Sequence, residues 1–85
     1  MKIFLISDNY DMYIGFRLVG IAGMVVKNTE KLDTQIEEVI KEENIGILLI
    51  SQKLCKTSPK LIDDIKDNRR FPLVVEIPDR KIEVR

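Results

Sequence analysis

The chain has 85 residues, of which 45% are apolar and 33% are charged, a balance typical of a folded globular protein and not of a disordered one. Its 14 basic side chains equal its 14 acidic ones, which argues against nucleic acid as the main partner because phosphate binding usually leaves a basic surplus. With no histidine and one cysteine, Cys55, the sequence lacks the usual general base, the commonest metal ligand and any internal disulfide.

The first predicted strand is Lys2–Ser7. Its residues Ile3 to Ile6 are apolar without alternation, which is the pattern of a strand covered on both faces of a parallel sheet. This run is far too short for a signal peptide or a membrane-spanning helix. We therefore expect a cytoplasmic protein with no membrane segment of its own.

A helix is predicted next, at Asp11–Gly20. Asp8 or Asn9 is a suitable N-cap, and Gly20 is a suitable C-terminal stop. Gly15 lies inside this helix and costs about 1 kcal/mol relative to alanine. Its presence suggests that another backbone approaches closely, or that the helix is short and distorted.

The middle of the chain alternates again between a strand and a helix. A short strand is predicted at Met24–Val26, followed by a helix at about Glu30–Glu43 with Asn28 or Thr29 as its cap. The helix is apolar on one face only, as its spacing shows. The apolar positions are Leu32, Ile36, Val39 and Ile40.

The most apolar run, Ile45–Ser51, is predicted to be a central strand. Gln52–Lys56 indicates a single helical turn, and Ser58 is predicted to cap a helix at Pro59–Asn68, since proline suits the first helical position. The last strand is Pro72–Pro78.

This order of elements predicts an α/β fold. Right-handed crossovers give a small doubly wound, mostly parallel four-stranded sheet flanked by helices, and we expect the strand order 2-1-3-4 of flavodoxin-like and receiver-like proteins. We expect one domain over residues 1–78 and a charged tail over 79–85.

Ligands of open parallel sheets sit beyond the carboxyl ends of the strands, so we searched those positions for chemistry. A receiver domain needs an acidic pair, a phosphoacceptor aspartate and a lysine after a fifth strand. Here Asp8 is the one carboxylate in place, Ser51 occupies the acceptor position, and magnesium requires several oxygen ligands. A helix cap is the favoured interpretation of Asp8.

Other ligand classes have weaker support. The sequence has no GxGxxG or GxxxxGK[ST] motif, and SDNYDMY after the first strand is not a flavin phosphate loop. Cys55 is interpreted as a packed thiol, with Lys53 and Lys56 expected to lower its pKa slightly. We expect no cofactor, no metal and no catalytic residue.

Three stretches together resemble the F subunit of the V-type and A-type ATP synthases, and they cover nearly the whole chain. They are SDNYDMYIGFRLVGI at Ser7–Ile21, IGILLIS at Ile45–Ser51 and PLVVEIPDR at Pro72–Arg80. The matching positions are Asp8, Gly15, Phe16, Arg17, Leu18, Gly20 and Ile21, then Glu76, Ile77 and Pro78. Ser7 departs from the glycine usual in the family, and the sequence ends at Arg85, before the family's C-terminal helix.

The resemblance implies a non-catalytic central-stalk subunit of a rotary ATPase. It would bind the coiled coil of the stalk's D subunit near the subunit that seats the stalk on the rotor ring, would touch the catalytic head only indirectly, and would be held at the membrane only through the complex. A degenerate receiver-like signalling module that binds a protein partner is the alternative. A small enzyme or flavin binder is a third possibility.

The predicted strand order makes the second strand an edge with unpaired backbone groups. We therefore expect a docking surface along this edge and the neighbouring helix. The candidate residues are Gly15, Phe16, Arg17, Gly20, Met24, Val25 and Val26. The competing interpretation is that Phe16 belongs to the core, and that Arg17 pairs with Asp8 or Asp11 on the surface.

Overall fold

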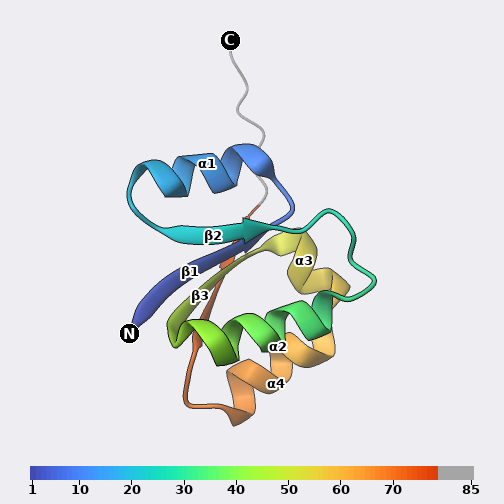
Figure 1. Ribbon diagram of the computed structural model, residues 1–85. Coiled ribbons are helices and arrows are strands. Elements are labelled where there is room, and N and C mark those ends of the chain that lie inside the picture. The colour runs from blue at the N-terminus through green and yellow to red at the C-terminus, as the bar shows by residue number, and fades with distance from the viewer. Residues whose placement is uncertain (79–85) are drawn as a thin grey trace.

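The computed structural model describes residues 1–78, and the predicted tail at 79–85 lies outside the described residues. Within residues 1–78 four strands and four helices follow one another in the order that the sequence predicts, and Figure 1 shows their arrangement. The elements are β1 (Lys2–Ser7), α1 (Tyr10–Leu18), β2 (Ala22–Val25), α2 (Leu32–Glu43), β3 (Ile45–Ser51), α3 (Gln52–Thr57), α4 (Pro59–Asn68) and β4 (Leu73–Ile77). None of the helices within 1–78 is long and apolar enough to cross a bilayer.

The four strands form one parallel sheet in the order β2-β1-β3-β4, which confirms the predicted topology. β1 and β3 are the interior strands, and this position explains their uninterrupted apolar sequences, because interior parallel strands are shielded on both faces along much of their length. β2 and β4 are the two edges.

One face of the sheet carries the main hydrophobic core. Phe4, Ile6, Leu48 and Ile50 point to this side and pack against apolar residues of α2, α3 and α4. We call it the core face. Its helix residues are all at most 7% exposed, and they are Leu32, Ile36, Leu54, Cys55, Ile62 and Ile65.

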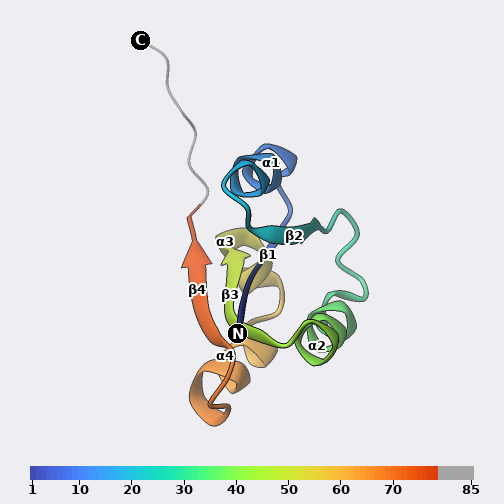
Figure 2. The ribbon, with the colours of Figure 1, turned by 60° about the vertical axis from the view of Figure 1, so that its left-hand side comes forward.

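The opposite face carries α1, which packs on β1 and β2. We call it the α1 face. Figure 1 shows α1 on one side of the sheet and α2 with α4 on the other, and Figure 2 shows α1 beside β2 and away from β4. Leu5 is fully buried beneath this helix, whereas α1 itself contains no buried residue.

The N-cap of α1 is Asn9. Its side-chain oxygen accepts a hydrogen bond of 3.1 Å from the Met12 backbone N–H, so the favoured assignment of Asp8 as the structural cap is wrong. At the other end Gly20 has a φ of 87°, and its N–H donates to the Arg17 carbonyl at 3.0 Å. Gly20 is therefore the helix stop that the sequence predicts.

α1 begins one residue before its predicted start and β4 one residue after it, and two other element starts differ by two residues. β2 begins at Ala22 instead of Met24, and α2 begins at Leu32 instead of Glu30. Asn28 does not cap the helix, because its side chain accepts a hydrogen bond from the Glu30 N–H and closes a turn before the helix.

Candidate docking surface

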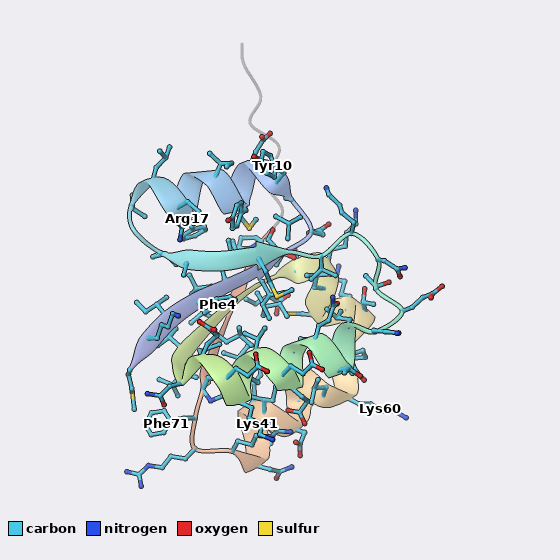
Figure 3. The ribbon with its side chains drawn as sticks, viewed as in Figure 1. Phe4, Tyr10, Arg17, Lys41, Lys60 and Phe71 are labelled. Carbon is cyan, nitrogen blue, oxygen red and sulfur yellow. The ribbon has the colours of Figure 1, made fainter. Side chains whose placement is uncertain are left out.

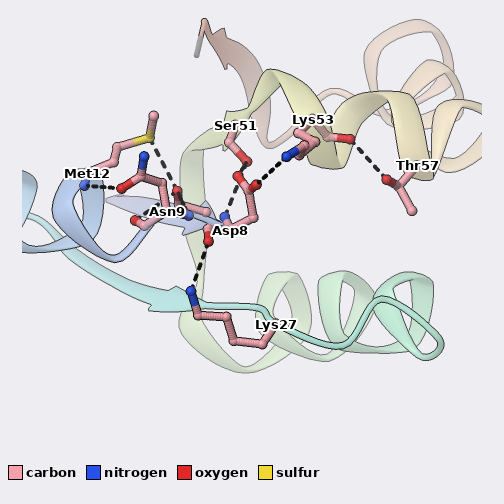
Figure 4. Close-up of polar contacts among 8 residues, drawn as sticks. Asp8, Asn9, Met12, Lys27, Ser51, Lys53 and Thr57 are labelled. Atoms are coloured by element: carbon pink, nitrogen blue, oxygen red, sulfur yellow. Dashed lines mark hydrogen bonds and ion pairs between the residues drawn. The ribbon is translucent and has the colours of Figure 1, made fainter. Parts of the chain in front are cut away.

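Hydrogen bonds and an ion pair connect the residues at the carboxyl ends of β1, β2 and β3 with one another (Figure 4). The Asp8 carboxylate accepts from the Ser51 hydroxyl at 2.9 Å and lies 3.9 Å from the Lys53 ammonium. Lys27 donates to the Asp8 backbone carbonyl at 3.4 Å. Ser51 is fully buried. Asp8 therefore ties the ends of β1 and β3 together, which is a structural role distinct from the predicted cap.

The Cys55 thiol is buried in the core, in the helix that follows β3. Within residues 1–78 no group of three or more metal-ligating side chains comes together. Burial, with a smaller contribution from the Glu76 carboxylate, raises the pKa of the Cys55 thiol to about 11. The expected lowering of this pKa by Lys53 and Lys56 is wrong, since the cation that opposes the rise is Lys66. A thiol of this kind is protonated at neutral pH and is not a nucleophile.

The candidate residues on α1 are distributed over different sides of the helix. Phe16 is half-buried and faces the sheet, whereas Gly15 and Arg17 are exposed. Two residues correspond to about 200° of helical rotation, so Gly15 and Arg17 point to nearly opposite sides. Figure 3 shows Arg17 on the side of α1 that is turned toward β2. Among the described residues Arg17 forms no ion pair with Asp8 or Asp11.

The close approach expected at Gly15 does not occur within the described part of the chain. A Cβ atom built on Gly15 would meet no atom within 4 Å. The close approach occurs instead at Gly23 in β2, where a Cβ would lie 2.7 Å from the Leu5 carbonyl oxygen. Gly15 is thus an open position on the surface of α1.

The candidate residues in β2 and directly after it also lie on different faces of the sheet. Val25 is half-buried on the α1 face, opposite Ser7 of β1. Met24 packs against the core face, and Val26 is 2% exposed and belongs to the core. Val26 is therefore not available for docking, contrary to the prediction.

Sequence reasoning missed a further apolar surface. Leu73 and Val75 of β4 are 57% and 44% exposed, and Ile3 of β1 is 42% exposed. At the end of α1, Leu18 and the C-cap residue Val19 are more exposed still. All of these residues lie on the α1 side of the sheet, so the exposed aliphatic residues collect on the side of the molecule opposite the core.

The fold is that of a small doubly wound α/β protein, with a parallel four-stranded sheet between helices. Residues 3–85 match the family described as ATP synthase (F/14-kDa) subunit. The chain belongs to this family, that of the F subunit of the A/V-type ATP synthases.

Individual relatives agree with this assignment. The F subunit of the A-type ATP synthase of Thermococcus kodakarensis is 32% identical over 85 residues, an alignment that covers 94% of this chain and 76% of the relative. The corresponding A-type F subunit of Methanococcus aeolicus is 35% identical over 81 residues, with the same coverage of both chains. That of Methanocaldococcus jannaschii is 32% identical over 81 residues, again with the same coverage.

Proposed function

We propose that this chain is a non-catalytic central-stalk subunit of an A/V-type ATP synthase. In this role it binds the coiled-coil D subunit, lies near the subunit that seats the stalk on the membrane rotor ring, and turns with the stalk as ATP turnover is coupled to ion transport. Its place is on the cytoplasmic side, attached to the membrane through the complex. The family membership carries the proposal. It is consistent with the carboxyl ends of β1 and β3, where Asp8 and Ser51 are hydrogen-bonded to each other.

The docking surface that we propose for the D subunit is the free edge of β2 together with the side of α1 nearest to it. β2 is an edge strand of four residues, and an edge strand has backbone N–H and C=O groups that a further strand can pair with. Arg17 on α1 and Val25 on β2 border this edge, whereas Gly15 and Gly20 are exposed elsewhere on the same helix and its end.

Co-expression with the D subunit of the same organism tests the proposal. We expect a stable one-to-one complex in size-exclusion chromatography with light scattering. Val25→Glu should weaken this complex at least tenfold, because a carboxylate beside the edge opposes strand pairing. Val39→Glu is the matched control, since Val39 is a half-buried valine of α2 on the opposite face.

The absence of any complex between the wild-type chain and the D subunit would refute the proposed function. A complex that Val25→Glu leaves intact, with the variant folded by circular dichroism, would refute the β2 edge while leaving the stalk assignment in place.

A further inference from the structure

A cation lies at each end of the β2 edge. The chain turns from α1 directly into β2, since the Ile21 N–H donates to the Phe16 carbonyl at 3.0 Å, so Arg17 lies beside the start of the strand (Figure 3). At the other end the Val26 N–H still donates to a β1 carbonyl at 2.8 Å, and Lys27 follows directly. Both cations are exposed, and together they bracket the edge of the sheet.

No carboxylate within residues 1–78 forms an ion pair with either of these cations. Lys27 donates to the backbone carbonyl of Asp8 at 3.4 Å, whereas the Asp8 carboxylate lies 3.9 Å from the ammonium of Lys53 (Figure 4). Asp11 precedes Arg17 by six residues, which places it about 120° away around the axis of α1. Because the whole chain has equal numbers of basic and acidic side chains, the β2 edge is a local positive region.

The strand between the two cations has an unprotected edge. Its four residues, Ala22–Val25, include neither a charged residue nor a proline, two features that commonly protect an edge strand from pairing. From Ala22 to Lys27 the chain advances by five residues, or about 16 Å at about 3.3 Å per residue. A strand that pairs with β2 therefore passes both cations, and side chains about four to six residues apart along it can reach one cation each.

We propose that the β2 edge binds an extended acidic segment of the D subunit, whose backbone pairs with β2 and whose carboxylates pair with Arg17 and Lys27. The inference rests on the proposed function and specifies the chemistry of its docking surface. The same two cations repel a basic segment, so they determine which strands the edge accepts.

The chain's own segments do not match this chemistry. In β4, the other edge strand, Glu76 is the one charged residue, so a second copy of the chain would bring a single carboxylate to the edge. Residues 79–85 have the sequence DRKIEVR, in which three basic side chains outnumber two acidic ones. An acidic segment of a partner therefore complements the edge better than either of them.

Binding to the full-length D subunit, measured by titration calorimetry at low and high salt, tests the proposal. We expect Arg17→Glu and Lys27→Glu each to raise Kd by about tenfold or more at low salt, because each turns an attraction into a repulsion between carboxylates. Arg17→Gln and Lys27→Gln should give smaller losses and a weaker salt dependence than the wild type. The matched controls are Lys41→Glu and Lys60→Glu, exposed lysines of α2 and α4 on the side away from α1 (Figure 3), which should bind within about twofold of wild type.

Two further measurements on the complex locate the contact. A carbodiimide couples an amine to a carboxylate that touches it, so mass spectrometry should find Lys27 linked to an aspartate or glutamate of the D subunit. Hydrogen exchange in the peptide that contains Ala22–Val25 should slow on binding, because the outward N–H groups of the edge become hydrogen-bonded. Circular dichroism checks that each variant is folded.

The outcomes are separable. If the wild-type chain forms no complex, the proposed function fails. If the complex forms but both glutamate variants bind within about twofold of wild type, or exchange at Ala22–Val25 is unchanged, this inference is overturned and the stalk assignment stands. If Lys27 is linked instead to Glu76 of a second copy, the occupant is this chain itself, which also overturns the inference.

Discussion

Alanine substitutions at three glycines should change stability in opposite directions, because the three backbone environments differ. Gly15 lies inside α1 with open space around the position of a Cβ. Alanine there removes the conformational freedom of glycine in the unfolded chain and meets no neighbour. We expect Gly15→Ala to raise the free energy of unfolding by about 0.5–1 kcal/mol.

At Gly20 and Gly23 the same substitution is unfavourable. Gly20 has a φ of 87°, a conformation that costs an L-residue about 1–2 kcal/mol, so Gly20→Ala should destabilise by about that amount. At Gly23 the new methyl group would lie 2.7 Å from the Leu5 carbonyl oxygen and 2.9 Å from the Leu5 Cβ. Both atoms belong to a buried interior strand and cannot move aside, so we expect Gly23→Ala to cost about 1–3 kcal/mol.

Thermal and urea denaturation followed by circular dichroism measures all three effects. A change of 1 kcal/mol corresponds to about 4–8 °C in Tm for a domain of this size, so the expected ranking is well resolved. A neutral Gly23→Ala variant would contradict the packing of β2 on β1. A Gly15→Ala variant destabilised by about 1 kcal/mol or more would show that Gly15 is not in open space.

Three further predictions concern single side chains. Burial raises the pKa of the Cys55 thiol in the folded chain from 9.0 to about 11, so the unfolded chain loses the thiol proton at lower pH than the folded chain does. The free energy of unfolding should therefore fall by about 1 kcal/mol between about pH 8 and 10. Urea titrations measure this decline, which should be absent from Cys55→Ala. Hydrogen bonds from Asn68 and Arg69 hold the pKa of Asp64 below its usual value, so the stability that its ionised form contributes above about pH 4 is lost on acidification; Asp64→Asn should make the acid-side decline of Tm shallower, and an unchanged slope would contradict this. Asn9→Ala removes the α1 cap and should cost about 1 kcal/mol in thermal denaturation, and an unchanged Tm in Asn9→Ala would contradict the assignment of the cap to Asn9.

The interior strands could be predicted to the residue, because burial on both faces produces continuous apolar runs. β1 at Lys2–Ser7 and β3 at Ile45–Ser51 have the predicted bounds, and so does α4 at Pro59–Asn68, where Ser58 and Pro59 signal the start. The start of β2 could not be predicted. Ala22 and Gly23 have low strand propensity, and Gly23 is required by its contact with Leu5, which is a tertiary property.

The positions of the candidate docking residues in the fold could be predicted only in part, for a related reason. The edge position of β2 follows from the strand order, but the division of Gly15 and Arg17 between two sides of α1 depends on where the helix lies on the sheet. The run PLVVEIP has the pattern of a strand covered on both faces. Its exposed residues Leu73 and Val75 show that one of those covers is not provided by the described part of the chain.

The two faces of the sheet differ in their contribution to the stability of the fold, and this difference accounts for the exposure of Leu73 and Val75. A domain of 85 residues can build one well-packed layer, and here that layer is the core face, where Leu48, Ile50 and Ile36 are fully buried. The ion pairs of Arg69 with Glu37 and Asp64 close the same side by linking α2 to the end of α4. Because the core face holds the fold together, the α1 face can leave apolar side chains open without unfolding the domain.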